Sequence, residues 1–177
     1  MRLLNADEIE VKVKQVTASG AVVLLYKTAR VDMDVLDETF GPENWQCKYK
    51  EIKENLYCEI GVWFEKIGQW VWKEDCGIES RADGDGNEKK GEASDAFKRA
   101  GFKWGIGREL YTAPFIFISA DALGGVDSKE YNGKKSYYLK NKFLKLHVAK
   151  ISHFDNGDID KVAIKDEKGN LVWCNAK

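Results

Sequence analysis

The first part of the chain alternates apolar and charged residues, a pattern that predicts half-buried strands. Residues 8–16 (EIEVKVKQV) alternate as far as Lys14, and residues 21–26 (AVVLLY) form a run of strongly β-forming residues. Because the turn-forming sequence TASG separates the two segments, we expect a β-hairpin whose successive side chains point to opposite faces.

The apolar spacing then becomes that of a helix and afterwards that of strands again. Residues 28–40 predict a helix, which the Gly-Pro sequence at 41–42 ends. Its apolar positions are Val31, Met33, Val35, Leu36 and Phe40. Three further strands are expected at residues 45–52, 56–64 and 69–77. This order predicts an α+β fold, with one antiparallel β-sheet (hairpin, helix, three-stranded meander) packed by helices.

A polar, glycine-rich loop at residues 81–91 precedes a second predicted helix. Ser94 is placed to cap this helix, an earlier start at Lys90 is the alternative, and Gly105 is placed to end it. The apolar stripe of the helix, which suits packing on a sheet, consists of Ala93, Phe97, Ala100 and Trp104.

Beyond this helix the sequence predicts a β-rich C-terminal extension. The apolar run PFIFI precedes a loop rich in Gly, Asp and Asn at residues 119–135. A terminal meander is expected at residues 143–154, 159–166 and 171–174. We therefore divide the chain into a main domain, residues 1–118, and an extension, residues 119–177, which packs on the main domain or forms a small lobe.

Composition and charge narrow the class of protein. The chain of 177 residues is 44% hydrophobic, which is enough for a buried core, and its net charge of −1 argues against a uniformly basic coat. A local basic groove is compatible with that total, because binding depends on where the charges lie. Without a signal peptide or an apolar run of about 18 residues, we expect an intracellular, soluble protein with no membrane segment.

The four cysteines show no CxxC spacing, and each lies in a strand-like stretch. We therefore expect reduced, half-buried thiols and no metal site.

One face of the second predicted helix combines cations with an aromatic ring. Lys98, Arg99, Phe102 and Lys103 fall together by the i, i+3, i+4 rule, with Asp95 on the same face. Helix cations are ordinarily solvated, but a solvated face seldom needs a phenylalanine. Ammonium and guanidinium groups neutralise phosphates, and a ring offers a base a stacking surface, so the face fits DNA. A protein interface at Phe102 is an equal alternative.

Three residues of the predicted hairpin are further candidates for binding DNA. Lys12 and Lys14 alternate with valines, so both project from one sheet face, which is either a solvent face or the edge of a groove. Tyr26 closes the second strand as a core, rim or stacking residue.

The sequence offers little for catalysis. It contains no GxxxxGK[ST], HExxH or GxSxG, so ATP hydrolysis by a P-loop is excluded. The glycines at 105 and 107 follow a helix rather than a strand and do not complete GxGxxG. Carboxylates around Asp75 leave a metal-dependent nuclease as a minor alternative.

Three motifs in fixed order carry a family resemblance: VLDETFGPENW at 35–45, DCG at 75–77 and SDAFKRAGFKWGIG at 94–107. Together with the hairpin that ends in Tyr26, they resemble the Rad52/22 family of single-strand annealing proteins. The bacteriophage and prophage members, of which PFIFI is typical, are the most similar. The resemblance covers about residues 5–111, and the terminal meander has no counterpart in it.

The resemblance implies a non-enzymatic protein that assembles into a ring or related homo-oligomer in the cytoplasm of a bacterial host. It implies that the protein anneals complementary DNA strands in recombination and repair, without ATP or another cofactor. The implied groove for single-stranded DNA is lined by Lys98, Arg99, Tyr26 and either Lys12 or Lys14. The implied second site, for double-stranded DNA, has Lys53, Lys89 and Lys90 as candidates.

One residue departs from the family pattern. Eukaryotic members have a further arginine one turn after the Lys-Arg pair, where this chain has Phe102. Either Lys103 supplies the charge, or Phe102 replaces a phosphate contact by stacking. A passive, monomeric module that binds single-stranded DNA without annealing is the main alternative function.

Overall fold

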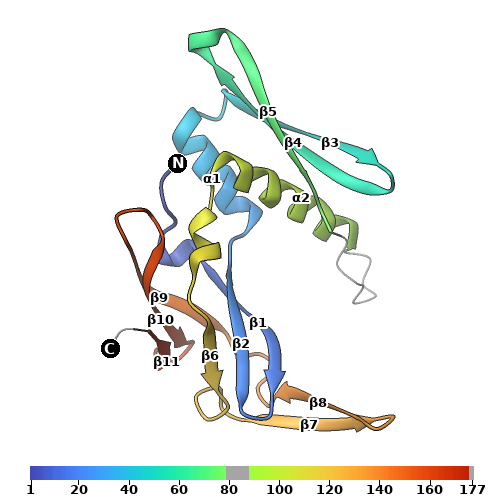
Figure 1. Ribbon diagram of the computed structural model, residues 1–177, viewed down its shortest axis with the longest axis vertical. Coiled ribbons are helices and arrows are strands. Elements are labelled where there is room, and N and C mark those ends of the chain that lie inside the picture. The colour runs from blue at the N-terminus through green and yellow to red at the C-terminus, as the bar shows by residue number, and fades with distance from the viewer. Residues whose placement is uncertain (79–87, 176–177) are drawn as a thin grey trace. The chain divides into compact units, whose positions relative to one another are not determined.

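The computed structural model describes residues 1–78 and 88–175, which form two compact units (Figure 1). The first unit comprises Met1–Leu3 and Lys27–Arg108, and the second comprises Leu4–Tyr26 and Glu109–Lys177. The chain therefore passes more than once between the units, and each unit is built from segments that lie apart in the sequence.

The first unit is a three-stranded antiparallel sheet with two long helices and one short helix in its described part. The strands are β3 (Trp45–Ile52), β4 (Asn55–Phe64) and β5 (Gln69–Cys76), in the order β3-β4-β5. The short helix η2 (Glu65–Ile67) joins β4 to β5, and the long helices are α1 (Ala29–Phe40) and α2 (Glu88–Trp104). Helix α2 packs on β4 and β5 and also contacts α1 (Figure 1).

The predicted apolar stripe of α2 is confirmed. Phe97 and Ala100 are fully buried, as are Ile60 and Val62 of β4. The indole Nε1 of Trp104 donates a hydrogen bond of 3.0 Å to the carbonyl oxygen of Ile60, so its polar atom is satisfied beside the core.

Helix α1 begins and ends as its sequence predicts. The Thr28 hydroxyl accepts a hydrogen bond from the backbone N–H of Val31, and Gly41 (φ 84°) ends the helix in a conformation that favours glycine. Met33 was expected in the apolar stripe, but its side chain is 39% exposed and lies outside it. The helix instead buries Asp32, whose partner is described below.

The second unit is almost entirely β-structure. Its six-stranded sheet has the order β11-β10-β9-β1-β2-β6, and a separate two-stranded ribbon is formed by β7 and β8. The described part of this unit contains two short helices, η1 (Ala6–Glu8) and η3 (Arg108–Thr112), and its other elements are strands. The first residue of η3, Arg108, belongs to the first unit. The strands are β1 (Glu10–Thr17), β2 (Gly20–Tyr26), β6 (Ile116–Ser119), β7 (Val126–Tyr131), β8 (Lys134–Leu139), β9 (Leu146–His153), β10 (Ile159–Asp166) and β11 (Leu171–Cys174).

The expected single sheet of hairpin and meander is divided in the structure. The hairpin β1-β2 is paired on one side with β9, where Glu10 lies opposite His147, and on the other side with β6. The meander β3-β4-β5 forms its own sheet. Alternation along a strand reveals that one face is buried but not which strands will be its neighbours, so the pattern could not show the division.

The expected loop at residues 119–135 contains a strand that the sequence reading missed. Strands β7 and β8 form a hairpin whose turn residues, Asn132 and Gly133, both have positive φ angles, of 48° and 70°. An Asn-Gly pair is the sequence most favourable to such a two-residue turn. Residues 119–135 contain few apolar side chains, so the sequence of this segment resembles that of a loop.

The expected loop at residues 81–91 is only partly described. Residues 81–87 lie outside the described ranges, and residues 88–91 are helical, because α2 begins at Glu88, before the expected cap at Ser94. None of the helices in residues 1–78 and 88–175 has the length and apolar composition that a bilayer span needs. All four cysteines lie in strands, as expected, but only Cys76 is half-buried: Cys58 is buried, and Cys47 and Cys174 are exposed.

Candidate nucleic-acid interface

Helix α2 presents the predicted cations on one partly exposed face. The side chains of Lys98, Arg99 and Lys103 are 24%, 41% and 48% exposed. Phe102 lies among them and is half-buried. Because the opposite stripe of α2 is anchored in the core, these side chains are held on a rigid element.

Asp75, at the end of β5, lies between two of these cations. Its carboxylate oxygens are 3.6 Å from Nε of Arg99 and 3.5 Å from Nζ of Lys103. Nζ of Lys103 also donates a hydrogen bond of 2.6 Å to the carbonyl oxygen of Glu74, and Lys98 is 3.8 Å from Asp95. The carboxylates orient the cations and at the same time reduce the positive charge of the face.

The turn after α2 adds a cation that the sequence reading did not select. Arg108 donates hydrogen bonds of 2.9 and 2.8 Å to the carbonyl oxygens of Phe102 and Lys103, and its guanidinium carbon lies 5.7 Å from the centroid of the Phe102 ring. Positive φ angles at Gly105 and Gly107 let the chain turn back. A basic residue just beyond a glycine-ended helix is the signal that could have identified it.

A buried ion pair supports α2 from beneath. Nζ of Lys27 lies 2.5 and 2.6 Å from the two carboxylate oxygens of Asp32, and it donates a longer hydrogen bond to the carbonyl oxygen of Lys98. A Cβ atom on Gly101 would lie 2.2 Å from Oδ1 of Asp32, so only glycine fits there. Burial raises the pKa of Asp32 to about 6, although the nearby Lys27 ammonium opposes the shift.

A lysine of β5 fixes the C-terminal end of the same helix. Nζ of Lys73 donates a hydrogen bond of 3.0 Å to the carbonyl oxygen of Lys103 and lies 4.3 Å from the centroid of a Trp104 ring. A cation at a helix C-terminus is favoured by the helix dipole. Lys73 therefore positions the helix end that carries the candidate residues.

The hairpin candidates lie in the second unit. Tyr26 is the last residue of β2 and is 39% exposed, and Nζ of Lys12 lies 5.4 Å from the centroid of its ring. Lys12 also forms an ion pair of 3.1 Å with Glu10. Lys14 is exposed at the irregularity in pairing between Val13 and Gln15, so it does not continue the regular ladder.

The structure thus gathers the seven predicted residues into two groups. Lys98, Arg99, Phe102 and Lys103 share a face of α2 in the first unit, whereas Lys12 and Tyr26 touch in the second unit, with Lys14 on the same strand. The candidates for a duplex site, Lys53, Lys89 and Lys90, are all exposed. Within residues 1–78 and 88–175, no group of three or more His, Cys, Asp or Glu side chains is arranged to hold a metal ion.

Comparison with known proteins identifies the class to which this chain belongs. A family model described as Rad52/22 family double-strand break repair protein matches residues 2–121, a segment that contains all seven candidate residues. No curated protein and no solved structure matches the chain. Because the family model covers well over half of the sequence, the chain belongs to the Rad52/22 family.

Proposed function

We propose that this protein binds single-stranded DNA and anneals complementary strands in homologous recombination and DNA repair. It acts without ATP or another cofactor, as a non-enzymatic, ring-shaped homo-oligomer of the bacteriophage and prophage branch, in the cytoplasm of a bacterial host. Family membership supports the role in double-strand break repair. Residues 1–118 are the annealing domain in this proposal.

The observation that carries the proposal is the face of α2. Lys98, Arg99 and Lys103 surround a half-buried phenylalanine ring on a helix anchored to a sheet. Ammonium and guanidinium groups bind phosphate oxygens, and an aromatic ring stacks on an unpaired base, which contributes about 1–3 kcal/mol per base. No base edge is read by such contacts, so binding is expected to depend little on sequence.

The hairpin of the second unit repeats the same chemistry on a smaller scale. Lys12 and Tyr26 combine an ammonium group with an exposed ring, and Lys14 adds a further exposed cation. We propose that both groups contact the same class of ligand, single-stranded DNA.

An oligomer reconciles this role with the net charge of −1. Each copy carries a local cationic face, and a ring would repeat that face many times along one strand. Linked sites bind far more tightly than one site alone, so no copy has to be basic overall. A second site for double-stranded DNA is part of the proposal, with Lys53, Lys89 and Lys90 as its candidates.

Annealing of two labelled complementary oligonucleotides tests the proposal directly. We expect the native protein, without nucleotide, to anneal them faster than the spontaneous rate, and Lys98→Ala/Arg99→Ala to lose at least tenfold of that acceleration, because two phosphate contacts disappear. Size-exclusion chromatography of both proteins shows whether the oligomer is intact.

A matched control removes two positive charges elsewhere. Lys66 and Lys168 are exposed, in η2 and in the turn after β10, and Lys66→Ala/Lys168→Ala should anneal like the native protein. A native protein that binds single strands and leaves annealing at the spontaneous rate would establish the passive binding module instead.

A further inference from the structure

The most basic segment of the chain lies outside the part that matches the family model. Residues 126–150, which contain β7, β8 and the start of β9, hold seven lysines and two acidic residues. Their local net charge is +5, in a chain whose total is −1. The lysines are Lys129, Lys134, Lys135, Lys140, Lys142, Lys145 and Lys150.

These seven lysines are all exposed, and one of them, Lys135, lies opposite the acidic Glu130 in the β7-β8 ladder. As far as the described residues reach, none of them forms an ion pair. Uncompensated ammonium groups attract counterions, and a polyanion that displaces those counterions gains affinity from their release.

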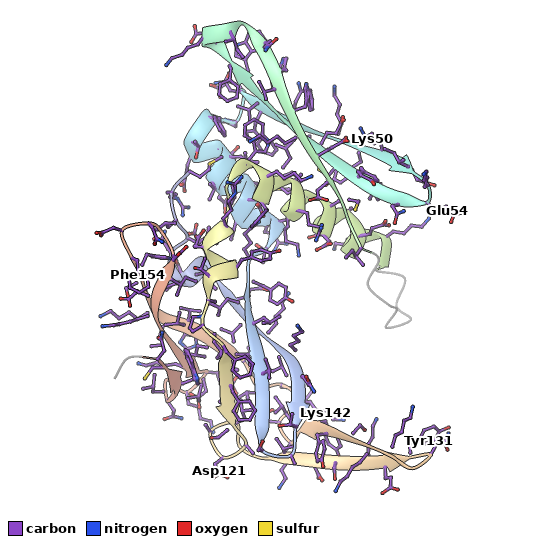
Figure 2. All side chains as sticks on the ribbon, in the orientation of Figure 1. Lys50, Glu54, Asp121, Tyr131, Lys142 and Phe154 are labelled. Carbon is purple, nitrogen blue, oxygen red and sulfur yellow. The ribbon has the colours of Figure 1, made fainter. Side chains whose placement is uncertain are left out.

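Two aromatic side chains in the segment are largely exposed to solvent, although burial of an apolar ring is favourable. Tyr131, at the tip of the β7-β8 hairpin, is 76% exposed, and Phe143, in the connection that follows β8, is 85% exposed. Figure 2 shows Tyr131 at the far end of the hairpin and Lys142 beyond its other end. Neither ring is used by the core, so both are available to a ligand.

The strand register arranges rings and cations on one face of the hairpin. Tyr131 lies opposite Lys134, and Lys129 lies opposite Ser136. Because alternate residues share a face, this face carries Lys129, Tyr131, Lys134 and Tyr138, together with the single carboxylate of Asp127. The opposite face carries Lys135 over the ring of Tyr137.

We propose that the β7-β8 hairpin and residues 140–145 after it form an additional contact surface for single-stranded DNA, outside the annealing domain. The lysines bind phosphates, and Tyr131 and Phe143 stack on bases. Single-stranded DNA fits better than duplex, because exposed rings need unpaired base faces, which a duplex hides inside its stack. This inference rests on the proposed function, because it extends the same ligand to a second part of the chain.

Binding of a labelled oligo-dT to the full-length protein at several salt concentrations tests the charges. For Lys129→Ala/Lys134→Ala/Lys142→Ala we expect the slope of log affinity against log salt to become shallower by about 2, since each single-strand phosphate contact contributes about 0.7. The matched control, Lys66→Ala/Lys161→Ala/Lys168→Ala, removes three exposed lysines elsewhere and should leave the slope unchanged.

A second variant tests the rings. Tyr131→Ala/Phe143→Ala should weaken binding at least about fivefold without changing the salt slope, because stacking involves no counterion release. Both side chains are exposed, so the variant is expected to fold, and circular dichroism checks this.

The outcomes separate this inference from the proposed function. A native protein that binds and anneals, while both hairpin variants keep native affinity and slope, would overturn the inference and leave the proposed function standing. Binding of the same two variants to a labelled duplex is measured alongside. If they bind the duplex more weakly than the native protein does but keep native affinity for oligo-dT, the assignment to single strands is overturned. A native protein with no affinity for oligo-dT at low salt would overturn both.

Discussion

Two cationic surfaces of this protein are built in opposite ways. On α2, each of Lys98, Arg99 and Lys103 has a carboxylate within 4 Å, from Asp95 or Asp75. The lysines of the β7-β8 hairpin have no such partner among the described residues. Helix α2 is also supported by a buried ion pair, whereas the hairpin is a two-stranded ribbon with exposed rings.

Paired and unpaired cations contribute to DNA binding in different ways: paired cations position the strand, and unpaired cations attract it. A cation held by a carboxylate has its position fixed before the ligand arrives, at the cost of competition between carboxylate and phosphate. An unpaired lysine on a flexible stem attracts a strand from a distance but imposes little geometry on it. We therefore expect α2 to determine how DNA is held and the hairpin to determine how readily it is captured.

The largest effect is expected from removing the support of α2. In Gly101→Ala the new methyl group collides with the Asp32 carboxylate and disturbs the buried pair with Lys27. The free energy of unfolding should fall by about 3 kcal/mol or more. Gly133→Ala, in the open turn of the hairpin, should cost only about 1 kcal/mol, from the left-handed backbone.

Urea unfolding of both variants measures this contrast. Equal losses of stability would mean that α2 does not depend on the buried pair, and the comparison between a supported and an unsupported surface would fail.

A smaller effect is expected from pH. Because the pKa of Asp32 is raised from 3.8 to about 6 on folding, the folded state binds a proton that the unfolded state releases between these values. Stability from this group therefore falls as pH rises through that window and is greater at pH 5 than at pH 7, by about 1 kcal/mol.

The difference in unfolding free energy between the native protein and Asp32→Asn, measured from pH 7 to pH 5, isolates the contribution of this carboxyl group. The native protein should gain relative to the variant as pH falls. A difference that stays constant over this range would contradict the expectation.

The smallest effect is expected from Asp75→Asn. The substitution removes the negative charge between Arg99 and Lys103 and keeps a side chain of the same shape. Because partly exposed ion pairs contribute about 0.2–1 kcal/mol, affinity for oligo-dT should rise up to about fivefold at low salt, with less gain at high salt. Weaker binding would show that Asp75 matters more for orienting the two cations than for opposing the phosphate.

Most local elements, and the C-terminal ends of both long helices, were within reach of the sequence. The glycine at the end of each long helix and the apolar stripe through Phe97 depend on neighbours within a few positions, so their patterns are visible in the chain. The face of α2 was predicted for the same reason, because helical periodicity alone places Lys98, Arg99 and Phe102 together.

The features that depend on distant partners were not predicted. The carboxylate of Asp75 and the lysine at position 73 reach α2 from β5, and Asp32 reaches Gly101 from α1. Nothing in their local sequence distinguishes them from ordinary solvent-facing charges. The hairpin of the extension was missed for a different reason: its Asn-Gly turn is a local signal, but the strands beside it have too few apolar residues to show a core-facing pattern.

The place of β1 in the middle of its sheet ties an early segment of the chain to segments that are synthesised much later. Its partners β9 and, across β2, β6 are synthesised much later, whereas the strands and helices of the first unit come mostly from one continuous stretch of chain, Lys27–Arg108. Pairing between such distant segments is slow, because the intervening chain must first be closed into a loop. During translation the first unit should therefore acquire protease resistance early. The hairpin that bears Lys12 and Tyr26 should become resistant only after β6 and β9 have been synthesised.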